Sequence, residues 1–180
     1  MIRRLTFLLL LLFPATATFL HAQRSDDVLS DKEVDELRES AYFANDRVLV
    51  FIKLIDTRVD SIRDLYAHTR RPGREQDTHD LLEQFTALAD ELSDNLDEYT
   101  ENHRDIRKAL PKLIENTERW ATAIKSPPDD SAYNVSRNLA LESIRDLRED
   151  ATHTLDEQRA WFKAHPPAKS DSSIAGDAPR

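Results

Sequence analysis

Apolar residues recur at steps of three, four or seven positions in four separate stretches of this chain. This spacing places one apolar stripe along an α-helix and is incompatible with the two-residue period of a strand. The stretch 48–55 is apolar nearly all round and rich in β-branched residues, so a buried strand competes there. No second run of this kind exists for it to pair with, and the helical spacing continues beyond it. The chain is therefore expected to be all-α, with coiled-coil-like seams between its helices.

Five helices are expected from these stripes and from the turn residues between them. Ser30 and Glu33 have capping-box spacing and open a short helix that ends near Ala44. The long helices are expected to include residues 48–66, 81–101, 106–124 and 131–163. Pro111 either kinks the third long helix or marks its true start. Short connections predict antiparallel neighbours, so the expected fold is an up-down-up-down antiparallel four-helix bundle with a short additional N-terminal helix.

The N-terminus has the features of a secretory signal peptide. Two arginines precede an apolar run, a proline and small residues. Residues 1–22 are the expected signal, with cleavage after Ala17 or an uncleaved anchor as alternatives. Residues 23–165 would form one domain, and residues 166–180 a disordered tail. These features predict an exported protein, periplasmic or secreted, with no stable membrane span after signal cleavage.

Composition excludes several classes of function. The only glycines are Gly73 and Gly176, too few for a glycine-rich phosphate loop, a dinucleotide-binding turn or a nucleophile elbow. The net charge of −9 argues against nucleic acid as a partner. The chain has no cysteine, one methionine (Met1) and no Glu-x-x-His motif, which argues against disulfides, Met–His haem ligation and a di-iron centre. We expect no catalytic residue, no metal and no cofactor.

Two charged groups are candidate interaction surfaces. One is an exposed acidic face on the second long helix. Its members are Asp90, Asp94, Asp97 and Glu101. The other is the set of arginines around Gly73, which are Arg70, Arg71 and Arg74. The acidic face is either a solvated surface that helps to select topology or a ladder for a cationic partner or calcium. The arginines are either part of a tight corner or a contact for an anion.

Charge also predicts how the bundle is assembled. We expect the first and third long helices to be basic and the second and fourth to be acidic, so that each helix lies between two of opposite sign. The first and third connections should lie at one end of the bundle. The three arginines of the corner should then lie near Asp129 and Asp130.

The last expectation concerns surfaces that a plain bundle leaves uncovered. Helix 131–163 is longer than its neighbours, so its end, with Trp161 and Phe162, should project beyond them. Phe51 lies off the main seam and is a further candidate for the interaction surface. We expect the short N-terminal helix to cover it, with Leu37, Tyr42 or Phe43 touching Phe51, Leu54 or Trp161.

The function most consistent with these features is non-enzymatic binding of another protein or an envelope component. The alternative is a small-molecule or metal-binding bundle that uses carboxylate and histidine side chains. The partner and the oligomeric state stay open.

Overall fold

The computed structural model describes residues 28–166, and these are all-helical, as the apolar spacing predicts. Their elements are α1 (Asp31–Glu39), the 3-10 turn η1 (Ser40–Tyr42), α2 (Ala44–Ala67), α3 (Arg74–Glu101), α4 (Leu110–Lys125) and α5 (Asn134–Ala164). The expected signal peptide and residues 167–180 of the expected tail lie outside the described residues. No helix in the described part of the chain is both long enough and apolar enough to cross a membrane.

Local sequence signals explain most helix ends. The carboxylate of Glu33 accepts a hydrogen bond of 2.8 Å from the backbone N–H of Ser30, as the capping box requires. Gly73 has a φ of 85°, a left-handed conformation that glycine adopts without strain, so the corner between α2 and α3 is confirmed. Pro111 lies in the first turn of α4, where its missing N–H breaks no helical bond. It marks the start of α4, and Ile106 precedes the helix.

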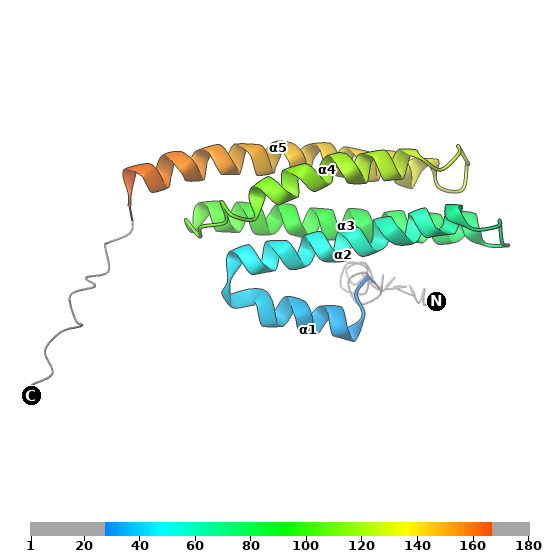
Figure 1. Cartoon of the computed structure of the whole chain (residues 1–180), viewed down its shortest axis with the longest axis horizontal. Helices are drawn as coiled ribbons and strands as arrows, with labels where there is room; N and C mark the ends of the chain where they lie inside the picture. The colour runs from blue at the N-terminus through cyan, green and yellow to red at the C-terminus, as the bar shows by residue number, and fades with distance from the viewer. Residues whose placement is uncertain (1–27, 167–180) are drawn as a thin grey trace, which may run out of the picture.

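The four long helices alternate in direction, so the fold is the expected bundle with an added N-terminal helix (Figure 1). The α2–α3 and α4–α5 connections lie at the same end, as expected (Figure 1). The rings of Tyr66 and Tyr133 meet edge to face there, with centroids 6.5 Å apart.

The four long helices are not arranged around the bundle in the order in which they occur in the chain. Contacts join α2 to α3, α3 to α5, α5 to α4, and α4 to α2. Among these described elements, α3 and α4 occupy diagonal corners: their backbones are not adjacent, although Phe85 of α3 and Trp120 of α4 meet in the core with ring centroids 5.9 Å apart. Residues 102–109, which connect them, must therefore cross the end of the bundle.

The expected alternation of helix charge is wrong. Helix α2 carries four basic and four acidic residues, and α5 carries five basic and six acidic ones, so neither has a strong sign. Only α3, with one basic and ten acidic residues, is strongly charged, and it packs between these two. At the α3–α5 interface, a serine binds an acid of the facing helix: the hydroxyl of Ser93 donates a hydrogen bond of 2.7 Å to Asp150. Helix charge therefore does not determine the order of the helices around the bundle.

Candidate interaction surface

Helix α1 covers one side of α2 and is fixed there by a buried ion pair. The Arg58 guanidinium is bonded to both carboxylate oxygens of Glu33 and donates to the carbonyl of Val28 at 2.6 Å. Leu37 is buried in the same core cluster as Phe51 and Leu54. The covering of Phe51 is thus confirmed, and Phe51 is not part of the accessible surface.

The segment 102–109 closes the far end of the core. Its apolar residues Ile106 and Ala109 are fully buried. Gln158 of α5 accepts a hydrogen bond of 3.0 Å from the Ile106 N–H and donates to the Arg104 carbonyl at 2.9 Å. On the opposite side, Asn45 of α2 accepts from the Ala109 N–H at 3.0 Å. The crossing is therefore held by two polar side chains from helices on either side of it.

Helix α3 ends in a Schellman motif that uses a histidine where glycine is usual. The Arg104 N–H bonds to the Tyr99 carbonyl at 2.8 Å and the His103 N–H to the Thr100 carbonyl at 3.2 Å. His103 consequently has a φ of 52°, which is uncommon for a residue with a Cβ atom. A residue held in this region can mark a functional position.

The imidazole of His103 stacks on the indole of Trp161, near the end of α5. Their ring centroids lie 4.1 Å apart, and His165 stacks on Trp161 at 4.4 Å. Phe162 meets the same indole edge to face at 4.8 Å, and the guanidinium of Arg107 lies 4.3 Å from the centroid of Phe162. Trp161 and Phe162 are half-buried. The end of α5, the helix that carries them, extends beyond the neighbouring helices, as expected (Figure 1).

Tyr42 and Phe43, where η1 joins α2, are the most exposed aromatic residues described. Their exposed fractions are 85% and 68%, so of the three residues expected to cover this surface only Leu37 is buried. Arg104 donates to the carbonyls of Ala41 and Tyr42, which ties this turn to the crossing segment.

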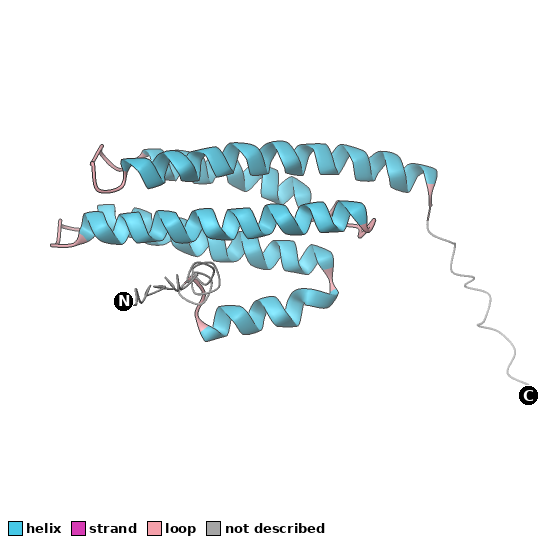
Figure 2. Cartoon of the chain, turned by 180° about the vertical axis from the view of Figure 1, so that it is seen from behind, coloured by secondary structure: helices cyan, strands magenta, loops and turns pink. Residues whose placement is uncertain are grey.

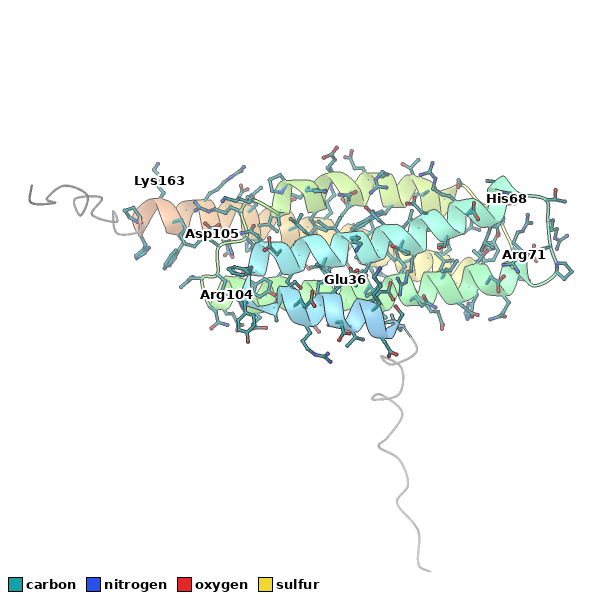
Figure 3. All side chains as sticks on the ribbon, turned by 60° about the horizontal axis from the view of Figure 1, so that its bottom comes forward. Glu36, His68, Arg71, Arg104, Asp105 and Lys163 are labelled. Carbon is teal, nitrogen blue, oxygen red and sulfur yellow. The ribbon has the colours of Figure 1, made fainter. Side chains whose placement is uncertain are left out.

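Two aromatic pairs lie at this end of the bundle, which we call the aromatic end. It consists of Tyr42, Phe43, His103, Arg104, Arg107, Trp161, Phe162 and His165. The η1–α2 turn, the crossing segment and the end of α5 lie at the same end of the molecule (Figure 2). Figure 3 shows Arg104, Asp105 and Lys163 there, with His68 and Arg71 at the opposite end.

The arginines of the corner bind acids of their own segment. Arg70 and Arg74 lie 3.1 and 3.2 Å from Glu75, and Arg71 lies 2.6 Å from Asp77. None is recorded with an ion pair to Asp129 or Asp130; Asp129 instead accepts from Arg137 at 2.7 Å. The two connections lie at the same end, as expected, but these arginines bind nearer carboxylates in the first turn of α3. The guanidinium of Arg74 also stacks on Tyr66, at 4.4 Å.

The acidic face of α3 is exposed, as expected. Asp90, Asp94, Asp97 and Glu101 all lie at the surface. Asp90 accepts a hydrogen bond of 3.3 Å from Ser143. Partial burial, opposed by this bond and assisted by the nearby Asp94, raises the pKa of Asp90 above its ordinary value. Among the described residues, no group of three or more histidines, aspartates or glutamates is placed to hold a metal ion.

A serine and a histidine form a further polar contact between α3 and α5. The hydroxyl of Ser136 lies 2.7 Å from Nδ1 of His79, whose Nε2 lies 3.5 Å from Glu83. The order of groups resembles a nucleophile, a base and an acid. Ser136 is only 5% exposed and lies at the helix interface, so the contact joins the helices.

The hollows among the described residues are surface grooves between adjacent helices. A groove of about 800 Å3 runs between α2 and α3, lined by acidic residues that include Asp60, Asp64 and Asp80. A second, of about 510 Å3, lies between α4 and α5. The core between the helices is filled by apolar side chains.

Of the aromatic end, the sequence identified Trp161 and Phe162 as exposed but gave no indication that His103, Arg104 and Arg107 would join them. The sequence feature that could have indicated these residues was the basic stretch 104–112, which ends beside Pro111. No family model, no curated protein and no solved structure matches this chain.

Proposed function

We propose that this protein is an exported, non-enzymatic helical bundle that binds another protein or an envelope component through the aromatic end. Export rests on the signal-like N-terminus. Binding rests on one observation: Tyr42 and Phe43 are largely exposed to solvent, at the end of the molecule that also carries the half-buried pair Trp161–Phe162. Aromatic side chains that are exposed to solvent next to one another are typical of contact surfaces.

The construction of the aromatic end supports this proposal. Arg104, Gln158 and Asn45 hold the backbone beneath the exposed rings, so the rings are presented from a rigid support. A rigid contact surface loses little conformational entropy when a partner binds. The competing interpretation, a small-molecule bundle, calls for an enclosed cavity with converging polar groups. The observed grooves are open to solvent.

Site-specific photo-crosslinking in producing cells tests the proposal. A photoreactive amino acid at Phe43 should yield adducts with an envelope component. The same residue at Val135, which is similarly exposed at 70% but lies at the start of α5, is the matched control. Adducts of equal yield from both positions, or none from Phe43, would contradict binding through the aromatic end.

Export is tested separately. N-terminal sequencing of the accumulated protein should find a start at or near Gln23. An intact Met1 would refute the cleaved signal.

A further inference from the structure

We infer that α1 is exchanged between two copies of this chain, so that α1 of each copy occupies the surface of α2 in the other. The product is a domain-swapped dimer with two-fold symmetry. This inference goes beyond the proposed function and does not depend on it. Three features support it: the separate position of α1, the form of the turn between α1 and α2, and a heptad stripe that continues from one helix into the other.

Helix α1 lies outside the four-helix bundle (Figure 1). Among the described elements, its backbone is adjacent only to η1 and α2. Leu37 is the one buried residue of α1. Side-chain bonds join Glu33 to Arg58, and Glu36 to Lys53 at 2.7 Å. A second copy of the chain is able to supply each of these contacts, because none of them requires α1 to be continuous with the α2 that it covers.

The turn between α1 and α2 lacks the helix-breaking residues of the α2–α3 and α4–α5 connections. Residues 31–67 contain neither proline nor glycine, whereas Pro72 and Gly73 follow α2. Ser40 keeps right-handed helical angles, and the extended residue of the turn is Phe43, with a φ of −116° and a ψ of 103°. Phe43 is the N-cap of α2 but supplies no side-chain hydrogen bond there. A change centred on this residue therefore converts α1, η1 and α2 into one continuous helix.

Tertiary contacts hold the turn in its folded-back form. Arg104 donates to the carbonyls of Ala41 and Tyr42 at 3.3 and 3.1 Å. In a continuous helix these two carbonyls accept hydrogen bonds from backbone N–H groups one turn later instead. Tyr42 and Phe43 are 85% and 68% exposed, so opening of the turn removes little side-chain burial.

A heptad stripe continues from α1 through the turn into α2. We call it the outer stripe, because it is separate from the stripe of α2 that faces the bundle core. Its members follow one another at alternating steps of four and three residues, and each is buried or half-buried: Glu33, Leu37, Ser40, Ala44, Arg47, Phe51, Leu54 and Arg58. The turn leaves the phase of the outer stripe unchanged. One straight helix would therefore present all of these side chains on the same face.

This phase allows two continuous helices to pair through their outer stripes. Helix α1 folds back on α2, so the same contacts made between two copies place the continuous helices antiparallel. With Glu33 of one copy opposite Arg58 of the other, Leu37 lies opposite Leu54. The ion pair that fixes α1 in the single chain then joins the two copies, twice in each dimer.

Crosslinking between two variants tests the exchange with the purified protein, in the form that cells accumulate. Glu36→Cys and Lys53→Cys are made in separate chains, mixed in urea, refolded together and treated with a short bismaleimide. The parent chain has no cysteine, so a covalent dimer that contains both variants should form through α1 of one copy on α2 of the other. The matched control is a mixture of Glu118→Cys and Arg148→Cys, whose parent side chains pair at 2.7 Å between α4 and α5. Its yield should be at least about tenfold lower.

Ala44→Pro distinguishes exchange from simple association. Ala44 is the first residue of α2, where proline is favoured, and the extended angles of Phe43 suit a residue before proline. In a continuous helix this proline removes a hydrogen bond and clashes with the preceding turn. Each dimer contains two such positions, so its association constant should fall at least about a hundredfold. Ala44→Gly should lower the same constant by about tenfold.

Two results would overturn the inference. One is a yield of mixed dimer no greater than that of the control pair. The other is an association constant that both Ala44→Pro and Ala44→Gly leave unchanged, since a dimer formed without exchange does not require a continuous helix.

Discussion

Replacement of Glu33 by glutamine should release α1 from the bundle. Glu33 is the one acid that neutralises the buried guanidinium of Arg58, and its side chain is 17% exposed. The hydrogen bond from Arg58 lowers the pKa of Glu33 from 4.5 to about 2, against the opposing effect of burial. Because each pKa unit corresponds to about 1.4 kcal/mol, and because the Ser30 capping bonds within α1 supply part of the lowering, the contact with Arg58 stabilises the docked state by at most about 3 kcal/mol.

Hydrogen exchange provides the direct measurement. In Glu33→Gln, amides from Val34 to Leu37 should exchange up to about a hundredfold faster, the factor that corresponds to a loss of about 3 kcal/mol in local stability. Amides in the middle of α5 should be unaffected. The control is Asp35→Asn, which breaks an exposed pair with Arg38 on the same helix. It should change the free energy of local opening of α1, as reported by hydrogen exchange, by less than about 1 kcal/mol.

The same contact predicts a dependence on pH. The pKa of Glu33 is lower in the folded protein than in the unfolded chain, so its stabilising effect is complete above pH 4.5. The effect should disappear as the pH falls from about 4.5 to about 2. Protection of the α1 amides, taken relative to the intrinsic exchange rate at each pH, should fall over this range in the parent protein but not in Glu33→Gln. Unchanged exchange in Glu33→Gln at neutral pH would refute the assignment of this ion pair as the anchor of α1.

Two further predictions concern the ends of the bundle. Gly73→Ala should lower the free energy of unfolding, measured with urea, by about 1 kcal/mol. The added Cβ would meet no atom within 4 Å, so the cost is that of the left-handed backbone alone, and a loss above about 3 kcal/mol would contradict this reasoning. Gln158→Ala should destabilise by about 2 to 3 kcal/mol, because it leaves the buried N–H of Ile106 unpaired. A near-zero change would show that the crossing segment does not depend on this bond.

The helices could be predicted from sequence because their signals are local. The spacing of residues such as Val48, Ile55 and Ile62 identifies the buried stripe of α2 without knowledge of its neighbours, and all three are buried. The capping residues of α1 and the glycine of the α2–α3 corner act within a few positions. Each of these signals lies within the helix or turn whose conformation it determines.

The order of helices around the bundle could not be predicted in this way. A sequential ring and the observed diagonal arrangement use the same apolar stripes. The choice depends on whether residues 102–109 pass along one edge or cross the end. The crossing is fixed by Asn45 and Gln158, single polar residues that lie 64 and 52 positions from their partners Ala109 and Ile106. Nothing in a periodic pattern distinguishes such residues from ordinary surface amides.

The crossing segment also explains why the aromatic end exists at all. Because the chain passes diagonally over the core, α3 must end in a sharp left-handed turn, and this turn brings His103 against Trp161. The last turns of α5, which extend beyond the neighbouring helices, thereby pack against His103. Substitutions in the crossing segment would therefore alter both stability and binding. Tyr42 and Phe43 are largely exposed, so changes in binding at these two positions report mainly on the partner.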